Sequence, residues 1–511
     1  MIIIILLASV IVLYAFYEWK FTYWKRRGVP GPKCLPFLGN LWELTDVRKP
    51  RVIVLKEWTE KYGKAYGIYE GLIKVLVVSD LDMLEELFFK KFDDFHARKN
   101  LVLQGDLDNN PIMHIFDARG SRWKRLRSIS SPTFSSGALK KIHGTAEDSA
   151  FELVRLLSEK ADKGAFNIHS YYQEYTMDVI FRIALGQRTT NFFGNPTVKN
   201  AQDIFMRSHR WPIFILGNLI PDARPFLRGI YLKFSKALGF SYYQTFNKAV
   251  EAVLARLKQR EEDSKRGLEA GEPTDFIDLF IDAVSEEKVE DRSEFSKTDM
   301  HINKRLTTME IIAQCFVFIL AGFDTTANSI AYVSYLLAKN PDKQKKLIQE
   351  IDEICREQSI DYETLGKCKY LDAVVKEALR LYPLASFASS RLCMKNTTLG
   401  GIEIEEGVTV AADAFTIHRD KKIWGEDAEE FVPERWENPS NRHIMSWFPF
   451  GAGPRTCIGM RLAYMEEKLA LAHILKRFEI VAGPETEKDL TLLGTLTIAP
   501  ESVTVHLKTR E

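Results

Sequence analysis

The sequence predicts a mainly α-helical globular protein with small β-sheets, preceded by one N-terminal transmembrane helix. Three observations support this fold class. The chain opens with an apolar run, most of the remaining sequence has helical periodicity, and only short stretches have the β-branched composition of strands. Hydrophobic residues make up 46% and charged residues 27% of the 511 residues. These fractions exclude a largely disordered, collagenous or polytopic membrane protein.

The apolar run at residues 2–17 is interrupted only by Ser9, and basic residues follow it. At about 1.5 Å per residue it is short for a ~30 Å hydrocarbon core, but Glu18 and Lys20 can snorkel into the headgroups. A cleaved signal peptide is the alternative, disfavoured because no basic residue precedes the run and no A-x-A site follows it. By the positive-inside rule, the basic residues keep the body in the cytosol. We expect a retained membrane anchor at residues 1–27.

Residues 28–40 are rich in proline and glycine, beginning Gly-Val-Pro-Gly-Pro. Proline fixes φ and lacks an N–H donor, so this segment is not expected to be helical. We expect a stiff strap that directs the body away from the anchor, a role compatible with that of an ordinary linker. Residues 41–511 then form the globular domain.

This domain is predicted to be mostly helical. Short β-rich stretches predict strands at residues 74–78 and 407–411. Apolar residues at helical spacing predict helices at residues 82–89, 146–160, 172–185, 246–260 and 466–478. The charge-rich residues 261–273 and 284–304 are predicted to be exposed linkers or loops.

The longest predicted helix begins near Thr307, which forms a capping-box pattern with Glu310. The chain stays largely apolar from Met309 onwards, and Asn340-Pro341 ends the helix. A helix of about 30 residues is long enough to span a membrane. Polar residues disfavour a span because polar groups are costly in lipid; they are Gln314, Asp324, Thr325, Thr326 and Asn328. A buried helix through the middle of a globular body fits better.

Residues 321–326, Ala-Gly-Phe-Asp-Thr-Thr, interrupt the apolar character of this helix. A glycine in mid-helix costs about 1 kcal/mol relative to alanine, and a threonine hydroxyl can bond back to the i−4 carbonyl and loosen the turn. The pattern predicts a local opening in a buried helix, where a small ligand could sit. A polar core patch whose groups are all satisfied is the alternative.

Charge and cysteine content narrow the function classes. Lys and Arg number 70 against 69 Asp and Glu, so no charge excess suggests nucleic acid as a partner. The six cysteines contain no C-x-x-C pair or tight cluster. A disulfide framework and a structural zinc site are therefore not expected, and the pattern suits a reducing compartment.

One cysteine, Cys457, lies in an unusual setting, because residues 450–459 read Phe-Gly-Ala-Gly-Pro-Arg-Thr-Cys-Ile-Gly. A dinucleotide-binding loop is excluded, since its third glycine would fall at Thr456 and no long β-run leads in. Glycines let N–H groups turn toward Cys457, Arg455 adds positive charge, and a helix starting near Met460 can stabilise a thiolate. A thiolate among such donors ligates haem iron where electron push favours O–O cleavage.

This segment resembles the haem-binding loop of the cytochrome P450 superfamily, F-x-x-G-x-R-x-C-x-G, at every fixed position. Four more motifs agree in order and spacing. Glu377 and Arg380 match the family's E-x-x-R, and residues 433–436 match its P-E-R-F/W. Residues 321–326 match its A-G-x-D/E-T-T/S, and residues 123–127 match its W-x-x-x-R. Other stretches are similar to the animal microsomal clan that includes the vertebrate drug-metabolising family and thromboxane synthase, and suggest an invertebrate, nematode member.

The resemblance implies a cytochrome P450 fold, with a long central helix over the haem, and haem b (iron protoporphyrin IX) as the cofactor. It implies Cys457 as the proximal iron ligand and metal-binding residue. Asp324 and Thr325 are the implied catalytic residues, which manage protons on the distal side. Arg435 of the P-E-R-W segment is expected to join the E-x-x-R pair. The implied cofactor-binding residues are Trp123, Arg127, Arg391, Phe450, Arg455 and Cys457.

The implied activity is that of a haem-thiolate monooxygenase, which inserts one oxygen atom from O2 into a lipophilic substrate. The chain has no G-x-G-x-x-G, so NADPH electrons are expected to arrive through a separate cytochrome P450 reductase, with cytochrome b5 as an optional second donor. The expected location is the endoplasmic reticulum membrane, with the catalytic domain facing the cytosol. Family analogy places pocket residues at 101–116, 205–240, 316–321, 385–389 and 495–497.

Basic residues are candidates for docking an acidic redox partner; they are Arg119, Arg122, Lys124, Arg125, Lys140, Lys141, Lys421 and Lys422. Two other functions are compatible with the same scaffold. An isomerase or dehydratase acting on a peroxide would need no electrons, and the Asp324-Thr325 pair disfavours it. A non-catalytic haem sensor or carrier is disfavoured by the same pair and by the membrane strap.

Overall fold

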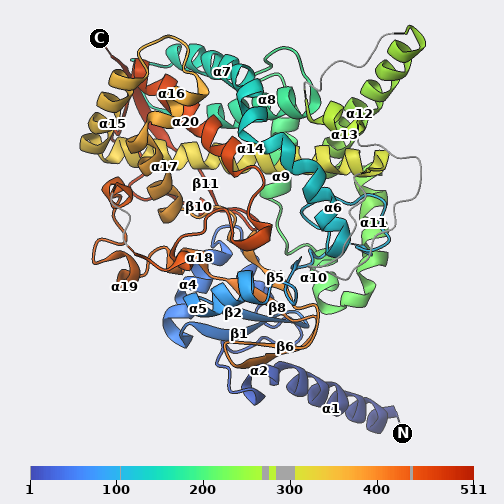
Figure 1. Ribbon diagram of the computed structural model, residues 1–511. Helices are drawn as coiled ribbons and strands as arrows, with labels where there is room; N and C mark the ends of the chain where they lie inside the picture. The colour runs from blue at the N-terminus through green and yellow to red at the C-terminus, as the bar shows by residue number, and fades with distance from the viewer. Residues whose placement is uncertain (1, 104, 268–274, 283–304, 438–440, 511) are drawn as a thin grey trace.

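The computed structural model describes residues 2–103, 105–267, 275–282, 305–437 and 441–510 (Figure 1). A large helical region and a smaller β-rich region lie side by side, and the N-terminal helix α1 (Ile2–Phe21) projects from the β-rich end. The architecture is mostly helical with small sheets, as the sequence predicts.

The helix α14 (Thr308–Lys339) crosses the whole helical region, where it is yellow in Figure 1. It packs on α8 (His169–Leu185), α12 (Ser241–Lys265), α17 (Lys369–Leu381) and α20 (Met460–Arg477). The predicted capping box is present: Glu310 N–H donates to Thr307 Oγ1 at 3.2 Å, and Thr307 N–H donates to Glu310 Oε2 at 3.1 Å. By length and composition α14 could cross a membrane, but 61% of its apolar window is buried, as in a core helix.

The predicted local opening at residues 321–326 is wrong, because α14 runs through them as unbroken α-helix. The Thr325 hydroxyl donates to the Ala321 carbonyl at 2.7 Å without interrupting the helix. Packing explains the glycine at position 322, because a Cβ there would lie 2.9 Å from Cδ1 of Ile180 on α8. The glycine therefore permits close contact between α8 and α14.

The other predicted helices are confirmed with different bounds. Helix α7 (Ser136–Ser158) starts ten residues before residue 146, since Ser135 Oγ caps it by accepting from Ala138 N–H at 3.3 Å. The predicted helix at 82–89 is α5 (Leu81–Glu85) followed by a π-helical turn, η1 (Glu86–Lys90). Residues 261–265 of the first predicted linker instead extend α12, with Lys265 paired to Glu261 at 2.6 Å. Residues 266 and 267 form a turn, and residues 268–273 and 284–304 of the two predicted linkers lie outside the described residues.

Further helices complete the helical region and its connections. The α-helices are α2 (Tyr23–Arg26), α3 (Leu41–Leu44), α4 (Arg51–Tyr62), α6 (Gly120–Ser130), α9 (Thr197–Phe205), α10 (Pro212–Leu219), α11 (Arg224–Ala237), α13 (Phe276–Ile281), α15 (Pro341–Ile354), α16 (Tyr362–Lys367), α18 (Ala414–Ile417) and α19 (Lys421–Trp424). The 3₁₀ turns are η2 (Ser131–Phe134), η3 (Pro221–Ala223), η4 (Ser386–Ser389), η5 (Pro433–Trp436), η6 (Ile444–Ser446) and η7 (Gly453–Arg455).

The main sheet has five strands in the order β1 (Ala65–Glu70), β2 (Ile73–Val78), β8 (Thr409–Ala412), β5 (Arg391–Leu392) and β3 (Ala97–Arg98). Strands β2 and β8 are parallel and contain most of the two predicted strands. The antiparallel pair β3–β5 has a consequence for the site, because its register places Arg98 opposite Arg391. Three smaller sheets contain β4 (Phe166–Asn167), β12 (Thr504–Thr509) and β9 (Phe478–Val481); β10 (Leu492–Leu493) and β11 (Ala499–Pro500); and β6 (Thr397–Leu399) and β7 (Ile402–Ile404).

The segment after α1 packs on this sheet. Trp24 is buried against Gly67 of β1, where a side chain would collide with its ring. Gly67 N–H donates to the Pro30 carbonyl at 2.8 Å, and Trp24 Nε1 donates to the Ile68 carbonyl at 3.2 Å. The strap is therefore fixed to the globular body.

Candidate functional site

The segment around Cys457 is a tight loop between η7 and α20. Cys457 N–H donates to the Phe450 carbonyl at 2.9 Å, which closes the loop. Gly451 and Gly453 have φ values of +75° and +67°, in the left-handed region that favours glycine. A Cβ at Gly453 would also lie 2.2 Å from the Phe88 carbonyl oxygen. The backbone of the loop thus requires the glycines that the motif contains.

The thiol of Cys457 retains accessible surface, although protein surrounds the residue on its other sides. Burial raises its pKa, whereas the N–H groups of Gly459 and Met460 and the charges of Arg98 and Arg127 lower it. These groups are the donors and cations that stabilise a thiolate. Coordination to a metal would remove the proton, since a ligating thiol is deprotonated.

Four arginines converge on this loop. Arg455 donates to the carbonyls of His96 (2.9 Å), Ile115 (3.3 Å) and Ala118 (2.6 Å). The other three contact the loop backbone. Arg98 Nη2 donates to the Arg455 carbonyl (3.2 Å), Arg127 Nη1 to Thr456 (2.8 Å) and Arg391 Nη2 to Ala452 (3.5 Å).

The charges of these arginines are not balanced by ion pairs within the described residues. Burial lowers the pKa of Arg98 to about 10, and burial together with neighbouring guanidinium groups lowers the pKa of Arg391 and Arg455 well below the usual range. Nε of Arg391 is buried without a hydrogen-bond partner. A site with four such cations beside a thiol fits a cofactor with carboxylates and a soft metal, and haem has both in its propionates and its iron.

Two predicted haem residues complete this side of the site. The guanidinium of Arg455 lies over the ring of buried Trp123, 4.2 Å from its centroid. The ring of Phe450 packs on Tyr464 at 5.2 Å between centroids. The structure therefore brings all six predicted cofactor-binding residues to the loop or to its arginines. Arg98 is a further member that the sequence motifs do not mark.

The E-x-x-R pair lies in α17 and is fully buried, as both side chains are 0% exposed. Glu377 accepts from Arg380 at 2.8 and 2.9 Å and from Arg435 at 3.2 Å, so the predicted third member joins the pair. Trp436 Nε1 also donates to Glu377, at 2.9 Å, and the sequence motifs do not mark this bond. Burying the pair is tolerable because every charge in it is hydrogen-bonded.

This buried group fixes the start of the Cys457 loop through His418. Arg380 Nη1 donates to the His418 carbonyl at 2.7 Å, and Phe448 N–H donates to His418 Nε2 at 3.0 Å. Burial and the charges of Arg380 and Arg419 lower the pKa of His418 to about 3. The imidazole is therefore neutral at physiological pH and can accept the Phe448 hydrogen bond.

A cavity of about 380 Å³ lies on the side of α14 that carries Ala321 and Thr325. All five segments predicted as pocket walls contribute to it, which confirms that prediction. The apolar lining includes Leu101, Ile112, Phe116, Phe214, Phe316, Leu320, Ala385 and Leu496. The sequence missed Tyr242 and Phe246 of α12 and four charged residues, Arg51, Glu70, Lys99 and Asp117, which also line the cavity.

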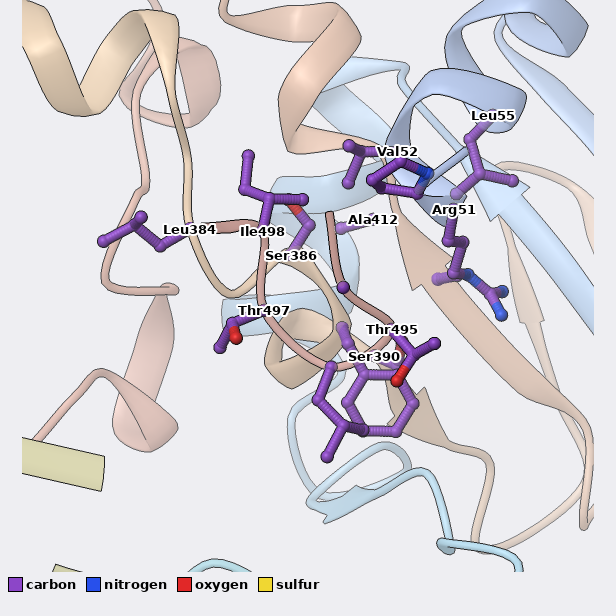
Figure 2. Close-up of a pocket in the computed structure, with 15 residues that line it drawn as sticks. Arg51, Val52, Leu55, Leu384, Ser386, Ser390, Ala412, Thr495, Thr497 and Ile498 are labelled. Atoms are coloured by element: carbon purple, nitrogen blue, oxygen red, sulfur yellow. The ribbon is translucent and has the colours of Figure 1, made fainter. Parts of the chain in front are cut away.

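A second pocket of about 20 Å³ adjoins this cavity, and the two share Arg51, Phe387 and residues 495–497. Figure 2 shows Thr495, Thr497 and Ile498 on one loop, with Leu384 and Arg51 at either side. Its volume suits about one water molecule. The loop at 495–497 thus forms the wall between the two spaces.

The two predicted catalytic residues lie differently with respect to the cavity. Thr325 lines it, but Asp324 does not. The Asp324 carboxylate accepts from Thr497 Oγ1 at 2.6 Å and from Asn328 Nδ2 at 3.0 Å. Burial raises the pKa of Asp324 to about 6, against the opposing effect of these two hydrogen bonds. Asp324 therefore reaches the cavity through the hydroxyl of Thr497, which does line it.

Comparison with known proteins identifies the family. A family model described as Cytochrome P450 matches residues 29–507. The chain belongs to the cytochrome P450 family. Among similar proteins is the putative cytochrome P450 cyp-13B1 of Caenorhabditis elegans, 49% identical over 512 residues that cover 99% of each chain. Putative cytochrome P450 CYP13A10 of the same organism is 46% identical over 97% of each chain, and CYP13A1 is 45% identical over 98%. The expected likeness to nematode members is confirmed.

Membership establishes haem as the cofactor and makes the protein a monooxygenase of the oxidoreductase class. Cytochromes P450 in general act on lipophilic substrates with O2 and a redox-partner reductase. The arginine cluster, the Cys457 loop and the apolar cavity described above agree with that chemistry.

Two of the arginines predicted to dock a redox partner are instead internal to this cytochrome P450. Arg125 is buried, and both Arg122 and Arg125 donate to Glu310, at 2.9 and 2.8 Å. Glu310 belongs to the capping box of α14, so the two arginines join α6 to that helix. Other predicted docking residues form surface ion pairs, among them Lys140 with Glu363 and Lys421 with Glu426.

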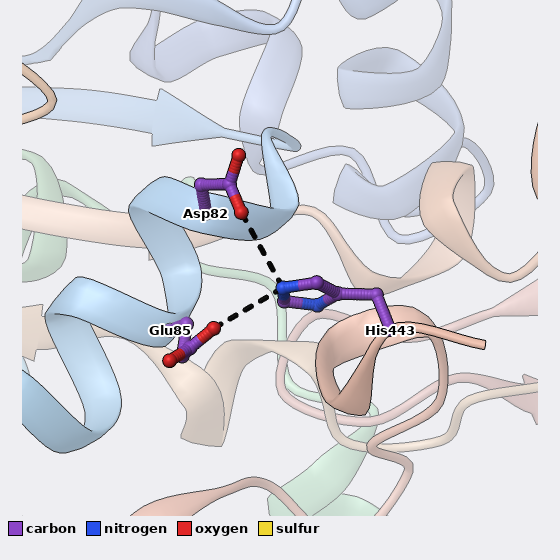
Figure 3. A group of neighbouring side chains, drawn as sticks. All are labelled: Asp82, Glu85 and His443. Carbon is purple, nitrogen blue, oxygen red and sulfur yellow. Dashed lines mark ion pairs between the residues drawn. The ribbon is translucent and has the colours of Figure 1, made fainter. Parts of the chain in front are cut away.

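A separate group of possible metal ligands comprises Asp82, Glu85 and His443 (Figure 3). His443 Nε2 lies 3.4 Å from Asp82 and 3.2 Å from Glu85. The other ring nitrogen accepts from Met445 N–H at 3.1 Å, so a neutral ring carries its proton on Nε2. A metal could bind His443 only if Nε2 carried no proton, and that conflicts with the hydrogen bond at Nδ1. The group fits a hydrogen-bonded link between α5 and η6 better than a metal site.

Proposed function

We propose that this cytochrome P450 oxidises a lipophilic substrate in the 380 Å³ cavity, with Cys457 as the iron ligand and with NADPH electrons from a separate reductase. The observation that carries the proposal is the convergence on one loop of a thiol and four arginines, two buried and two half-buried, that form no ion pair within the described residues. When bound, haem supplies the activation of dioxygen. The residues of the chain hold the cofactor, orient the substrate and deliver protons.

The arginines divide into two roles in this proposal. Arg455 uses three of its nitrogen atoms on backbone carbonyls, so it fixes the loop while adding charge. Arg98 likewise donates from all three of its nitrogen atoms, to the carbonyls of Ala388, Phe116 and Arg455. Arg127 and Arg391 keep more of their donors available, and they would hold the propionates with Trp123. Planar guanidinium groups suit carboxylates because they can donate two parallel hydrogen bonds.

Protons would reach the distal side by two hydroxyl groups. Thr325 presents its oxygen to the cavity while its own proton is held by the Ala321 carbonyl at 2.7 Å. Thr497 connects the cavity to Asp324, whose pKa of about 6 suits proton exchange near neutral pH. Asp324 would thus exchange protons with the cavity through Thr497, although its own side chain does not line the cavity.

The decisive experiment compares Cys457→Ala with Cys34→Ala, which removes a thiol outside the site. The ferrous–CO complex of the parent protein and of Cys34→Ala should show a thiolate-type Soret band, and Cys457→Ala should lose it. NADPH consumption with purified reductase, with and without cytochrome b5, should give oxygenated product only in the first two proteins. A Cys457→Ala protein that kept the band would contradict the assignment.

We also propose that residues 1–27 anchor the protein in the endoplasmic reticulum membrane, with residues 28–40 as the strap and 41–511 as the haem-binding catalytic domain in the cytosol. The apolar side chains of α1 support this, since Ile3 is 72% and Val12 is 68% exposed. Exposed apolar residues are also present on the body: Phe37 contacts Tyr17 at 4.1 Å, and Trp42 and Trp211 are exposed. Exposed apolar side chains of this kind suit a membrane.

Deletion of residues 1–27 tests this arrangement. The truncated protein lacks the packing of Tyr23 and Trp24 on the body, so it should be less stable, but it should still bind haem and leave the membrane fraction at lower salt or detergent than the full chain. Loss of haem from the truncated protein under matched expression would show that haem binding depends on this segment.

A further inference from the structure

The charged side chains at the cavity are unequal in number. Four cations line it, Arg51, Lys99, Arg207 and Arg228, but only two carboxylates, Glu70 and Asp117. Glu70 is used by two of the cations, since it pairs with Arg51 at 2.5 Å and with Lys99. Arg51, Lys99 and Glu70 therefore form one ion-paired group in the cavity wall.

Asp117 belongs to the haem side of the cavity. Its carboxylate lies 3.4 Å from His114 Nε2, and its charge raises the pKa of both Arg98 and Arg455. It therefore offsets part of the arginine cluster at the Cys457 loop. Glu70 is thus paired with Arg51 and Lys99, and neither carboxylate of the cavity forms an ion pair with Arg207 or Arg228 within the described residues.

Arg207 and Arg228 form no ion pair within the described part of the chain, and they flank one tyrosine. Arg228 and Tyr231 share a face of α11, being three residues apart. Arg207 donates to the Tyr231 hydroxyl, and its guanidinium lies 5.6 Å from the centre of that ring. The guanidinium of Arg228 lies beside Gly105, where a Cβ would be 3.3 Å from Nη1.

Two other cavity residues are affected by these charges. Burial raises the pKa of Tyr242, the charges of Arg228 and Arg207 lower it, and those of Asp117 and Tyr231 act in the opposite direction. Burial lowers the pKa of His209 to about 4, and the charges of Arg207 and Lys99 lower it as well. The region around Arg207 and Arg228 is therefore positive, and His209 does not add to that charge at neutral pH.

We propose that the substrate of this cytochrome P450 is a lipophilic carboxylic acid, whose carboxylate binds Arg207 and Arg228 while its apolar part extends along the cavity toward Thr325. The inference rests on the proposed monooxygenase function. An unpaired cation in a largely apolar cavity is unfavourable, and an anionic ligand removes that cost. Arginine favours a carboxylate because its planar fork matches the two oxygens.

The test measures binding of dodecanoic acid and of its methyl ester to the full-length holoenzyme. The two probes share an apolar chain, and only the acid carries a charge. Ligand binding is followed by the shift of the haem Soret band and, independently, by the rise in melting temperature. The acid should bind at least about tenfold more tightly than the ester, as expected for hydrogen bonds between charged groups.

Three variants assign the preference to named residues. Arg207→Met and Arg228→Met should each weaken binding of the acid about tenfold or more and leave that of the ester within about twofold. Lys233→Met removes a cation from the exposed face of the same helix, α11, and should change neither. A double variant that retains full acid binding would overturn the proposal, as would equal affinity of the parent protein for acid and ester.

These outcomes are separable from failure of the proposed function. Both binding measurements need no reductase and no turnover. A protein that binds the acid through Arg207 and Arg228 but yields no oxygenated product with NADPH and reductase would contradict the monooxygenase role and keep the binding site. A protein that oxidises the ester as well as the acid would keep the monooxygenase role and overturn the carboxylate site.

Discussion

The hydroxyl of Thr497 lies 2.6 Å from the carboxylate of Asp324, and it joins the C-terminal loop to the central helix. Thr497 follows a tight turn between β10 and β11, where Gly494 has a φ of +118° and a Cβ would lie 2.1 Å from the Thr497 carbonyl oxygen. The turn therefore needs glycine in order to bring Thr497 to α14. This contact gives a buried acid a route to the cavity that its own side chain does not reach.

The first prediction concerns Thr497→Val, which removes the hydroxyl at nearly constant volume. The hydrogen bond lowers the pKa of Asp324, so its loss should raise that pKa above its present value of about 6. Asp324 would then stay protonated to higher pH. We expect the inflection in the pH profile of coupling, the product formed per NADPH consumed, to move to higher pH.

Thr495→Val is the matched control for this experiment. Thr495 lines the same cavity, and its hydroxyl is buried without a hydrogen-bond partner in the described structure. Thr495→Val should leave the pH profile of coupling unchanged. An unchanged profile in Thr497→Val would mean that Asp324 takes no part in proton delivery.

The second prediction concerns Glu377→Ala in the buried E-x-x-R group. It would leave Arg380 and Arg435 without their carboxylate, and removing one partner of a buried pair typically costs about 3–5 kcal/mol. We expect a fall of that size in the free energy of unfolding, measured by urea denaturation of the holoprotein, or failure to accumulate haem-loaded protein. Glu479→Ala, at an exposed position of β9, should be within about 0.5 kcal/mol of the parent.

The third prediction compares two glycines of the Cys457 loop. Both have a positive φ, so alanine at either costs about 1–2 kcal/mol of backbone strain. Only Gly453→Ala adds a collision, since its Cβ meets the Phe88 carbonyl, whereas the nearest atom to a Cβ at Gly451 is Ser389 Oγ at 4.0 Å. We expect the haem-to-protein ratio after purification to fall much more in Gly453→Ala. Equal falls in the haem-to-protein ratio of the two variants would show that backbone strain, and not the collision with Phe88, determines the loss of haem.

Features that depend on neighbouring residues could be predicted from the sequence. The capping box at Thr307 and Glu310, the Glu377–Arg380 pair and the glycine-rich loop are local patterns, and each is present in the structure. Family resemblance added the five walls of the cavity and the contact of Arg435 with Glu377.

Features that depend on the pairing of distant segments could not be predicted. Thr497 and Asp324 are 173 residues apart, and no periodicity relates them. Arg98 belongs to no motif, and it joins the arginine cluster because β3 pairs with β5 opposite Arg391. Arg122 and Arg125 look like surface cations in the sequence, but folding places them beside Glu310. In each case the partner is set by tertiary structure rather than by spacing.

The last prediction concerns Thr325, the one predicted catalytic residue that lines the cavity. Its hydroxyl donates to the Ala321 carbonyl, so its oxygen can accept a hydrogen bond from a water or ligand in the cavity. Thr325→Ala should bind substrate and accept the first electron nearly as the parent does. Proton delivery should become less selective, so that more NADPH is spent on hydrogen peroxide.

The measurement is the ratio of oxygenated product to NADPH consumed, with peroxide assayed in parallel at matched substrate occupancy. Positioned acid–base groups typically contribute roughly 10²–10⁴-fold, and a water can replace a lost hydroxyl, so we expect a loss of coupling of about 10²-fold or less. Thr325→Ser keeps the hydroxyl and should retain most of the coupling. If Thr325→Ala is coupled as well as the parent, Thr325 is a packing residue of α14. The relay would then run through Thr497 and Asp324, and the shift expected in Thr497→Val would be its main signature.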